Sequence, residues 1–140
     1  MSYFTNQEKI ANKVVPALLE PMGYTVTRAE GQFKSYDFKI EKNGAKADLE
    51  FKARQASSSQ YPTWILEHKK VENIGLPFLY LNTYTDGVAR IWLVTEDLLS
   101  RTESGTRKFP DKTGGRSTKW VNKDVHYLTP DTAIMTKKTR

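Results

Sequence analysis

The sequence predicts an α+β (mixed α/β) fold with a central mixed sheet flanked by helices, and three observations indicate it. Apolar residues recur at helical spacing in the first 20 residues. Several later segments are rich in β-branched and aromatic residues or alternate apolar and polar ones, as strands do. Two connections, Lys42-Asn43-Gly44 and Thr85-Asp86-Gly87, have the composition of tight hairpin turns. The expected order is helix, three strands, helix, two strands (αβββαββ), with C-terminal additions.

The first helix is expected over residues 5–20. Thr5 and Glu8 stand three positions apart, as the two partners of a capping box do, so the helix should begin at Thr5. Pro16 removes a backbone donor inside the pattern, which predicts either a bend near the middle or a later start of the regular part. Gly23 follows its end. The apolar residues at helical spacing are Ile10, Ala11, Val14, Val15, Leu18 and Leu19.

Three antiparallel strands are expected next, over residues 24–27, 36–41 and 45–54. The polar, Ser-rich residues 55–62 are expected to form a loop. A second helix is predicted over residues 64–74 and is closed by Gly75.

The remaining elements are a hairpin, a short helix and a basic loop. Strands are expected over residues 78–84 and 88–94, and a helix capped by Thr95 over residues 96–100. Residues 101–124 have few aliphatic side chains and many Gly, Ser, Thr, Lys and Arg, so we predict a long basic loop there.

The C-terminal end is expected to hold a last strand at residues 125–128 and a mobile basic tail at 137–140. Residues 1–140 are expected to form one domain whose core lies between about residues 5 and 100.

Composition and charge narrow the classes of function. The chain of 140 residues carries a formal net charge of +6, which favours a polyanionic partner such as nucleic acid over a membrane. It has no Cys, which excludes disulfides and thiolate zinc sites, and only two His, so carboxylates must hold any metal. No segment approaches the roughly 20 apolar residues of a membrane span, and the N-terminal residues lack the apolar core of a secretory signal. We therefore expect a cytoplasmic protein.

The candidate site lies on the third predicted strand. Asp48, Glu50 and Lys52 share one face by the two-residue period of a strand, while the apolar residues between them face the other way. If the Asn43-Gly44 turn brings the second strand back beside the third, Asp37 approaches this group, and the hairpin register decides how closely. Two carboxylates suit Mg²⁺, which takes oxygen ligands and keeps several waters. A lysine one period away can orient or deprotonate the attacking water of a hydrolysis.

These segments, Ser35-Tyr36-Asp37-Phe38 and Asp48-Leu49-Glu50-Phe51-Lys52 joined by a hairpin, resemble the paired motifs of PD-(D/E)XK nucleases. That superfamily includes restriction endonucleases and Holliday junction resolvases, and its element order is similar to the one expected over residues 5–94. The resemblance implies a restriction-endonuclease-like fold in which Asp37 and Glu50 bind the metal. It further implies that the backbone carbonyl of Phe51 is a ligand and that Lys52 is the catalytic lysine.

Other residues compete with this interpretation. An acidic-X-Lys tripeptide alone is usually part of a solvated strand face. The nuclease interpretation is supported here by the combination of that tripeptide with an upstream acid, an apolar opposite face and the expected element order. The resolvase branch often carries a further acid on the first helix, where Glu8 is the best-placed match and Glu20 competes; we favour Glu8 as a helix cap. Tyr36 stands where the motif usually has proline. Pro110-Asp111 is a literal Pro-Asp that no acidic-X-Lys motif follows, so we set it aside.

The basic segment at residues 101–124 is a candidate surface for a nucleic-acid backbone, because its cations are interleaved with Phe109 and Trp120. A solvated flexible loop explains the same composition, and both interpretations stay open. The residues predicted to contact nucleic acid are Arg107, Lys108, Lys112, Arg116 and Lys119.

Some conspicuous side chains receive no catalytic role. His68 and His126 are far apart in the sequence, with no ligand partners at metal spacing. Trp64, Tyr80 and Trp92 lie within apolar patterns and are expected in the core.

The sequence thus predicts a Mg²⁺-dependent endonuclease, with Mn²⁺ able to substitute, that hydrolyses phosphodiester bonds of branched, phage or plasmid DNA. The resemblance suggests a bacterial or phage-infected host cell. A homodimer is expected, because one active site cuts one strand. The alternative is a non-catalytic nucleic-acid-binding module with the same fold, and a third class is an interaction protein whose charge only aids solubility.

Overall fold

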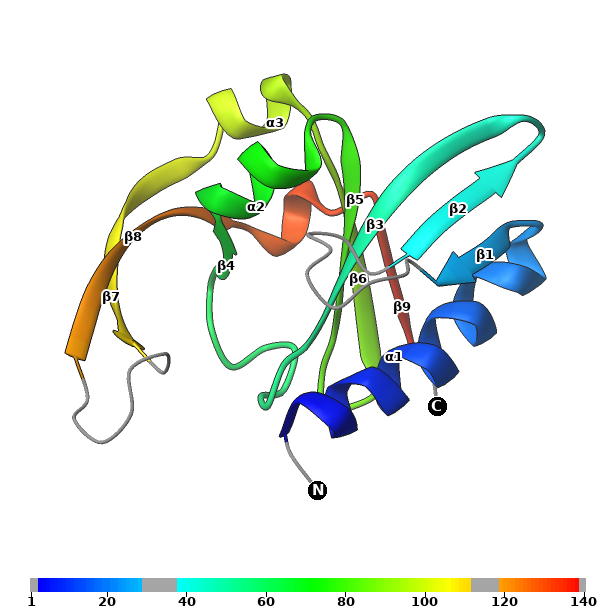
Figure 1. Ribbon diagram of the computed structural model, residues 1–140, viewed down its shortest axis with the longest axis horizontal. Helices are drawn as coiled ribbons and strands as arrows, with labels where there is room; N and C mark the ends of the chain where they lie inside the picture. Colours follow the sequence, from blue (N-terminus) through cyan, green and yellow to red (C-terminus); the bar gives the residue numbers. More distant parts are fainter. Residues whose placement is uncertain (1–2, 29–37, 112–118, 139–140) are drawn as a thin grey trace.

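Two sheets form the framework of the protein (Figure 1). The computed structural model describes residues 3–28, 38–111 and 119–138, and the side chains of residues 9–28, 38–109 and 120–138. Within these residues, a six-stranded sheet has the spatial order β1 (Thr25–Arg28), β2 (Phe38–Lys42), β3 (Ala45–Ala53), β5 (Phe78–Thr83), β6 (Val88–Val94), β9 (Met135–Lys138). A three-stranded sheet has the order β4 (Trp64–Glu67), β8 (Lys119–Leu128), β7 (Glu103–Asp111).

Three α-helices accompany the sheets in the described residues: α1 (Tyr3–Leu19), α2 (His68–Ile74) and α3 (Glu96–Ser100). Short 3₁₀ helices follow α1 at Glu20–Met22 (η1) and precede β9 at Pro130–Thr132 (η2). None of these helices has the length and apolar character needed to cross a membrane.

The first helix differs from the prediction at its start. It begins at Tyr3, so Thr5 lies inside the helix and the predicted capping box is wrong. The helix continues through Pro16 and ends at Leu19. Gly23 then takes a left-handed conformation with φ 94°, which glycine adopts without steric cost.

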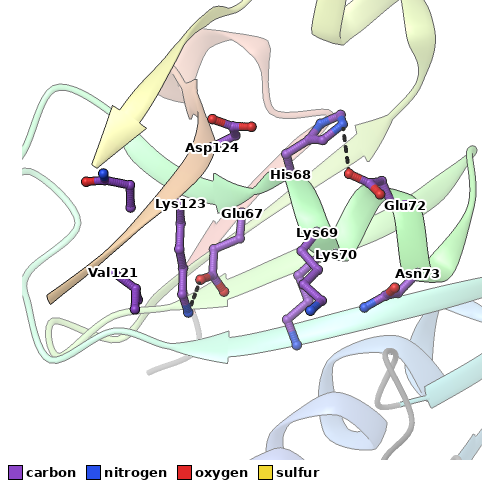
Figure 2. Close-up of a pocket in the computed structure, with 10 residues that line it drawn as sticks. Glu67, His68, Lys69, Lys70, Glu72, Asn73, Val121, Lys123 and Asp124 are labelled. Atoms are coloured by element: carbon purple, nitrogen blue, oxygen red, sulfur yellow. Dashed lines mark ion pairs between the residues drawn. The ribbon is translucent and has the colours of Figure 1, made fainter. Parts of the chain in front are cut away.

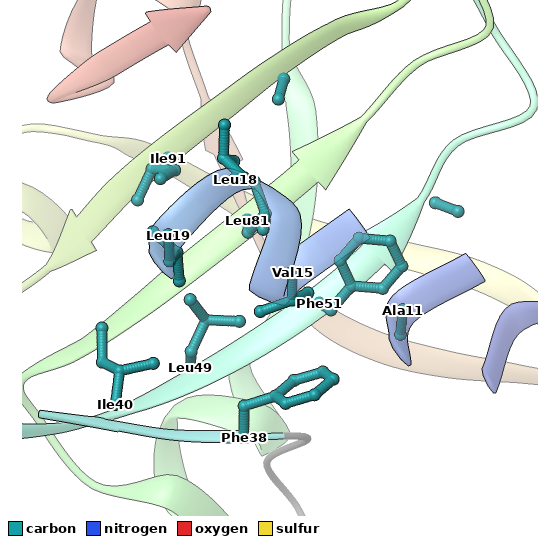
Figure 3. Packing of buried hydrophobic residues seen from close by; sticks show 12 residues of the cluster. Ala11, Val15, Leu18, Leu19, Phe38, Ile40, Leu49, Phe51, Leu81 and Ile91 are labelled. Atoms are coloured by element: carbon teal, nitrogen blue, oxygen red, sulfur yellow. The ribbon is translucent and has the colours of Figure 1, made fainter. Parts of the chain in front are cut away.

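One face of the six-stranded sheet packs against α1 (Figure 3). Leu49 of β3, Leu81 of β5 and Ile91 of β6 face the helix and are buried. The helix contributes residues from successive turns, which is why its apolar positions recur at helical spacing. These helix residues are Ala11, Val15, Leu18 and Leu19.

A second core fills the opposite face of the same sheet. Phe78 and Trp92 project from β5 and β6 and are fully buried. They pack with Leu66 of β4, Leu98 of α3 and Leu128 of β8, so the smaller sheet and the short helix cover this face. Trp64, Tyr80 and Trp92 are all buried, as predicted.

The three antiparallel strands after α1 are confirmed. The turn between β2 and β3 places Asn43 at φ 53° and Gly44 at φ 82°, and two such left-handed residues are what a tight hairpin turn of this kind requires. The register pairs Phe38 with Leu49 and Lys42 with Ala45. The antiparallel pair β5 and β6 is confirmed as well.

The predicted helix over residues 64–74 is wrong in its first half. Residues 64–67 form β4, and the chain enters α2 only at His68. β4 pairs with β8, and Trp64 and Leu66 on one side of it are buried in the second core. Burial on a sheet and burial on a helix give the same short apolar pattern, and the partner strand lies some 60 residues away in the sequence.

The predicted basic loop over residues 101–124 is wrong for residues 103–111 and 119–124, which form strands, while residues 112–118 lie outside the described part of the chain. β7 and β8 form an antiparallel hairpin paired from Glu103 with Tyr127 to Asp111 with Lys119, and the strand predicted at residues 125–128 is the end of β8. The hairpin extends away from the larger sheet on the side opposite β1 and β2 (Figure 1). Its outer part is largely exposed, so it lacks the apolar alternation that reveals half-buried strands.

The last elements divide between confirmation and correction. Thr95 caps α3 as predicted, because its hydroxyl accepts a hydrogen bond from the Leu98 amide at 3.0 Å. The predicted mobile tail is wrong for Lys137 and Lys138, which lie in β9 and pair with β6; residues 139 and 140 lie outside the described part of the chain.

Candidate functional site

Glu50 and Lys52 share one face of β3, as the strand period predicts. Glu50 lies opposite Tyr80 of β5, and Lys52 lies opposite Asn82. Both charged residues therefore lie on the face away from α1, beside the polar atoms of the neighbouring strand. The strands β3 and β5 are parallel, so the chain between them passes through β4 and α2.

Glu50 is a buried carboxylate. Only 7% of the residue is exposed, and the Lys70 ammonium of α2 lies 3.1 Å from its Oε1 atom. A buried charge is costly unless a partner compensates it, so a charge at this depth indicates a site with a purpose beyond packing. No feature of the sequence indicated Lys70, because the crossover between parallel strands brings α2 over β3.

Lys52 lies at the solvent-facing end of this group. Its pKa is lowered below the usual value, first by desolvation and then by the cationic Arg54 and Lys70, while Glu67 and Glu50 oppose the shift. Lys52 is exposed to solvent, yet charged residues of β3, β4 and α2 lie near it: Glu50, Glu67 and Lys70.

Asp37 lies outside the described residues. The residue after it, Phe38, begins β2 and lies opposite Leu49, the residue before Glu50. The hairpin register, on which the prediction depended, is thus known up to the position next to Asp37.

The other acids of the sequence analysis lie elsewhere. Asp48 forms a cross-strand ion pair with Lys39 at 3.2 Å, at the edge of the charged face. Glu20 is exposed in η1. Glu8 belongs to α1, but its side chain is outside the described part. Pro110-Asp111 ends β7 in the smaller sheet.

Phe51 turns its side chain toward α1, where it is 6% exposed. Its backbone carbonyl lies on β3, at the position between Glu50 and Lys52 in the sequence. The predicted metal donors of β3 are therefore a carboxylate and a carbonyl, both hard oxygen donors of the kind that Mg²⁺ takes. No group of three or more His, Asp or Glu side chains that could hold a metal occurs within residues 9–28, 38–109 and 120–138.

Arg54 continues the charged face. Its Nε donates to Asn82 Oδ1 at 2.7 Å, and its Nη2 donates to the carbonyl of Ile65 at 2.6 Å and to the Tyr80 hydroxyl at 3.0 Å. Arg54 was not among the predicted site residues, although it is the next residue on this face by the two-residue period that joins Glu50 to Lys52.

A pocket of about 690 Å³ lies between α2 and β8 and borders the candidate site through Lys70. Figure 2 shows Lys123 reaching from β8 to Glu67 at the end of β4, where their charged atoms are 2.9 Å apart. The pocket contains acids and bases in similar number, so it is not a simple basic groove.

The two histidines, given no partner by the sequence analysis, lie side by side. His68 Nδ1 and His126 Nε2 are 2.8 Å apart, and His68 Nε2 lies 3.4 Å from Glu72. The pair joins the start of α2 to β8. The pKa of His126 is lowered by burial first and by His68 second, with Asp124 opposing.

Three of the residues predicted to contact nucleic acid lie on the β7–β8 hairpin. Arg107 and Lys108 are exposed on β7, and Lys119 begins β8. Lys112 and Arg116 lie outside the described residues. Trp120 is 63% exposed on β8 beside them, which is unusual for so large an apolar side chain.

Comparisons with known proteins identify the fold. No protein-family model and no curated protein matches the chain. A solved structure, a Holliday junction resolvase from the archaeal hyperthermophile Archaeoglobus fulgidus, is similar with a TM-score of 0.52 and 12% sequence identity. The match covers 89% of this chain and 93% of that protein. The predicted restriction-endonuclease-like fold is therefore confirmed, and so is the resemblance to PD-(D/E)XK nucleases at the level of the fold.

Proposed function

We propose that the chain is a divalent-metal-dependent endonuclease that hydrolyses phosphodiester bonds of branched DNA. The observation that supports it most is the buried Glu50 carboxylate beside Lys52 on one face of β3. The similarity in fold to a resolvase favours a nuclease over other uses of such a pair and suggests a branched substrate such as a four-way junction.

Asp37 is proposed as the second acidic residue of the site. It is bonded to Phe38, whose partner Leu49 precedes Glu50, and adjacent Cα atoms are about 3.8 Å apart. Continuing the hairpin register by one residue would set Asp37 opposite Glu50.

Mg²⁺ or Mn²⁺ would be held by Glu50, Asp37 and the carbonyl of Phe51, since these oxygen donors suit a hard cation. When bound, such an ion supplies charge neutralisation at the phosphate and a more acidic water. Glu20 is too exposed to be favoured in this set, and Glu8 stays a secondary candidate.

The chain's own side chains have separable roles. Glu50 fixes a negative charge at the base of the site. Lys52 would orient the attacking water and stabilise the negative charge that develops on the phosphate. Lys70, which neutralises Glu50 in this structure, can also reach an incoming phosphate because over a third of its side chain is exposed.

The backbone phosphates of the DNA would contact the β7–β8 hairpin. The proposed contacts are Arg107, Lys108, Lys112, Arg116 and Lys119, and Trp120 offers a face for stacking. A homodimer would bring two such sites to the two strands of a junction.

A non-catalytic DNA-binding module is the second candidate function. The ion pair between Lys70 and Glu50 favours it, because it satisfies the carboxylate without any metal. In that case the hairpin would bind DNA and the charged face of β3 would be structural.

The test uses Glu50→Gln, with Asp48→Asn as a matched control on the same strand face. Labelled four-way junction, duplex and single-stranded DNA are incubated with Mg²⁺ or Mn²⁺. We expect Glu50→Gln to reduce cleavage of the junction by at least about 100-fold, because an enzyme that loses a group acting in the transition state loses activity by such factors. Asp48→Asn should cut normally. Lys52→Met and Asp37→Asn should resemble Glu50→Gln.

Binding measured without metal separates the two candidates. The nuclease proposal expects Glu50→Gln to bind junction DNA about as well as the unchanged protein. If the unchanged protein binds DNA but cuts none of these substrates with either ion, the binding module is correct and the nuclease proposal is wrong.

A further inference from the structure

Two partly buried arginines lie beyond Lys52 on the same face of the sheet. Lys52, Asn82 and Arg90 form one row across β3, β5 and β6. Arg54 follows β3 in the next row, and its amide donates to the carbonyl of Thr83 at 2.8 Å. Arg54 and Arg90 thus lie on either side of the Asn82 side chain.

Neither guanidinium has a carboxylate partner among the residues that the structure describes. Within the described part of the chain, Arg54 donates to the neutral acceptors of Asn82, Ile65 and Tyr80. Arg90 donates to the carbonyl of Ser58 at 2.8 Å. Partly buried cations are usually paired with an anion, so two of them side by side leave positive charge uncompensated.

Aromatic rings compensate these charges in part. The Arg54 guanidinium lies 5.7 Å from the centre of the Trp64 ring, and that of Arg90 lies 5.2 Å from the centre of the Tyr84 ring. Such contacts are weaker than an ion pair with a desolvated anion. They position the two guanidiniums without neutralising them.

Unpartnered donors gather in the same place. Asn82 is fully buried, and because Arg54 occupies its oxygen, the Nδ2 amide group faces another direction without a hydrogen-bond partner. Trp64 Nε1 is buried without a partner as well, whereas the Tyr84 hydroxyl and the Arg90 side chain interact with each other. Burial raises the pKa of Tyr84 to about 12, so its hydroxyl keeps its proton and remains a donor. Buried polar groups are nearly always satisfied, so the donors left over show that this part of the face has more donors than acceptors.

Holding the adjacent loop does not explain Arg90. Ser58 is fixed by Asp86, whose carboxylate accepts from the Ser58 amide at 3.1 Å and from its hydroxyl at 2.6 Å. Thr85 also donates its amide to the carbonyl of Ala56 at 2.9 Å. The loop is thus attached to the β5–β6 turn independently of Arg90.

We infer that Arg54 and Arg90 bind a phosphate of the DNA strand next to the phosphate that is cut. The identity of the ligand as DNA rests on the proposed function. The position follows from the sheet, because Arg54 reaches back to Tyr80, the residue opposite Glu50. The planar fork of arginine suits the oxygens of a phosphodiester.

The test compares Arg90→Met and Arg90→Lys with Lys13→Met, all in the full chain. Lys13 is a suitable control because it is exposed on α1, which covers the other face of the sheet. Binding of a labelled four-way junction is measured in EDTA at several salt concentrations. In parallel, unfolding temperature is measured in sodium phosphate and in sodium chloride at equal ionic strength.

We expect Arg90→Met to weaken junction binding about 10-fold to 100-fold and to reduce the salt slope of log K by about 0.9, the value for one lost phosphate contact on duplex DNA. Arg90→Lys should keep the slope and lose affinity, because the charge stays and the fork is lost. Phosphate should raise the unfolding temperature of the unchanged protein and not that of Arg90→Met. Lys13→Met should behave as the unchanged protein.

Wild-type affinity and salt slope in a folded Arg90→Met would overturn the phosphate site and make Arg90 a structural residue. If that variant does not fold, the absence of a phosphate-specific shift in the unchanged protein overturns it equally. The result is independent of catalysis. If Arg90→Met loses binding and the unchanged protein cuts no DNA, the phosphate site is supported and only the nuclease proposal is contradicted. If the unchanged protein cuts DNA and Arg90→Met has no effect, the nuclease proposal is supported and the phosphate site is contradicted.

Discussion

The strands β3, β5 and β6 of the six-stranded sheet carry side chains of different character on their two faces. Toward α1, the central positions are Leu49, Leu81 and Ile91, all buried among aliphatic neighbours. On the opposite face of these strands, Lys52 and Asn82 stand beside Arg90. Polar groups at this depth lower stability unless they are satisfied. The charged groups therefore depend for their stability on the α1 core and on the second core around Phe78 and Trp92, which lies on their own face of the sheet.

The largest effect on stability is expected on the α1 face. Leu49→Ala should lower the free energy of unfolding by about 2–5 kcal/mol, because a fully buried leucine leaves a cavity. Urea unfolding measures it. Leu93→Ala is the matched control, since Leu93 of β6 is 41% exposed, and it should cost less than about 1 kcal/mol. Equal losses at the two positions would show that α1 does not protect Leu49 as described.

Arg54→Met tests the charged face and should have a smaller effect, about 1–3 kcal/mol of unfolding free energy. The change removes donors to Asn82 Oδ1 and to the carbonyl of Ile65, which are left without those hydrogen bonds. Arg101→Met, at an exposed position, should change stability by no more than about 0.5 kcal/mol. A neutral or stabilising Arg54→Met would mean that this arginine has no structural role.

The contact between His68 and His126 predicts that the stability of the protein depends on pH. Because the pKa of His126 is lowered in the folded protein, the unfolded chain takes up this proton first as pH falls. The contribution to stability is therefore complete above pH about 6.5 and is lost as pH falls from there through the lower folded pKa. The charged or titratable neighbours are His68 on α2, Glu72 beyond it, and Asp124 on β8.

Urea midpoints measured between pH 5 and 8, a range chosen around the usual pKa of about 6.5, check this dependence. His126→Gln should flatten the loss of stability on the acid side. The same slope in the variant and the unchanged protein would assign the dependence to other groups.

The smallest effect is expected for the ion pair between Lys39 and Asp48. Their atoms are 3.2 Å apart, but the lysine side chain is 60% exposed, so a double-mutant cycle should give a coupling below about 1 kcal/mol that decreases with added salt. A larger, salt-insensitive coupling would place Asp48 inside the functional group of charges instead of at its edge.

Local features of the fold were predictable from the sequence. The Asn43-Gly44 turn, the Thr95 cap and the two faces of β3 each depend on residues within a few positions of one another. For the same reason the sequence analysis could place Glu50 and Lys52 on one face. Asp37 stays a prediction, because it lies outside the described residues.

The features that were missed depend on distant partners. β4 is a strand because β8 pairs with it, and the hairpin strands are stabilised by each other with little apolar alternation. Lys70 reaches Glu50 only because the crossover carries α2 over β3, and His68 meets His126 for a similar reason. No local periodicity encodes such meetings.

The place of β9 affects how the protein behaves in concentrated solution. By pairing with β6 from Val88 to Ile91, it covers backbone groups that could otherwise recruit a strand from another molecule. Its own exposed residues include Lys137 and Lys138, whose like charges discourage a further strand from adding. Removing residues 135–140 should therefore cause self-association that light scattering detects, and a monodisperse truncated protein would contradict this protective role.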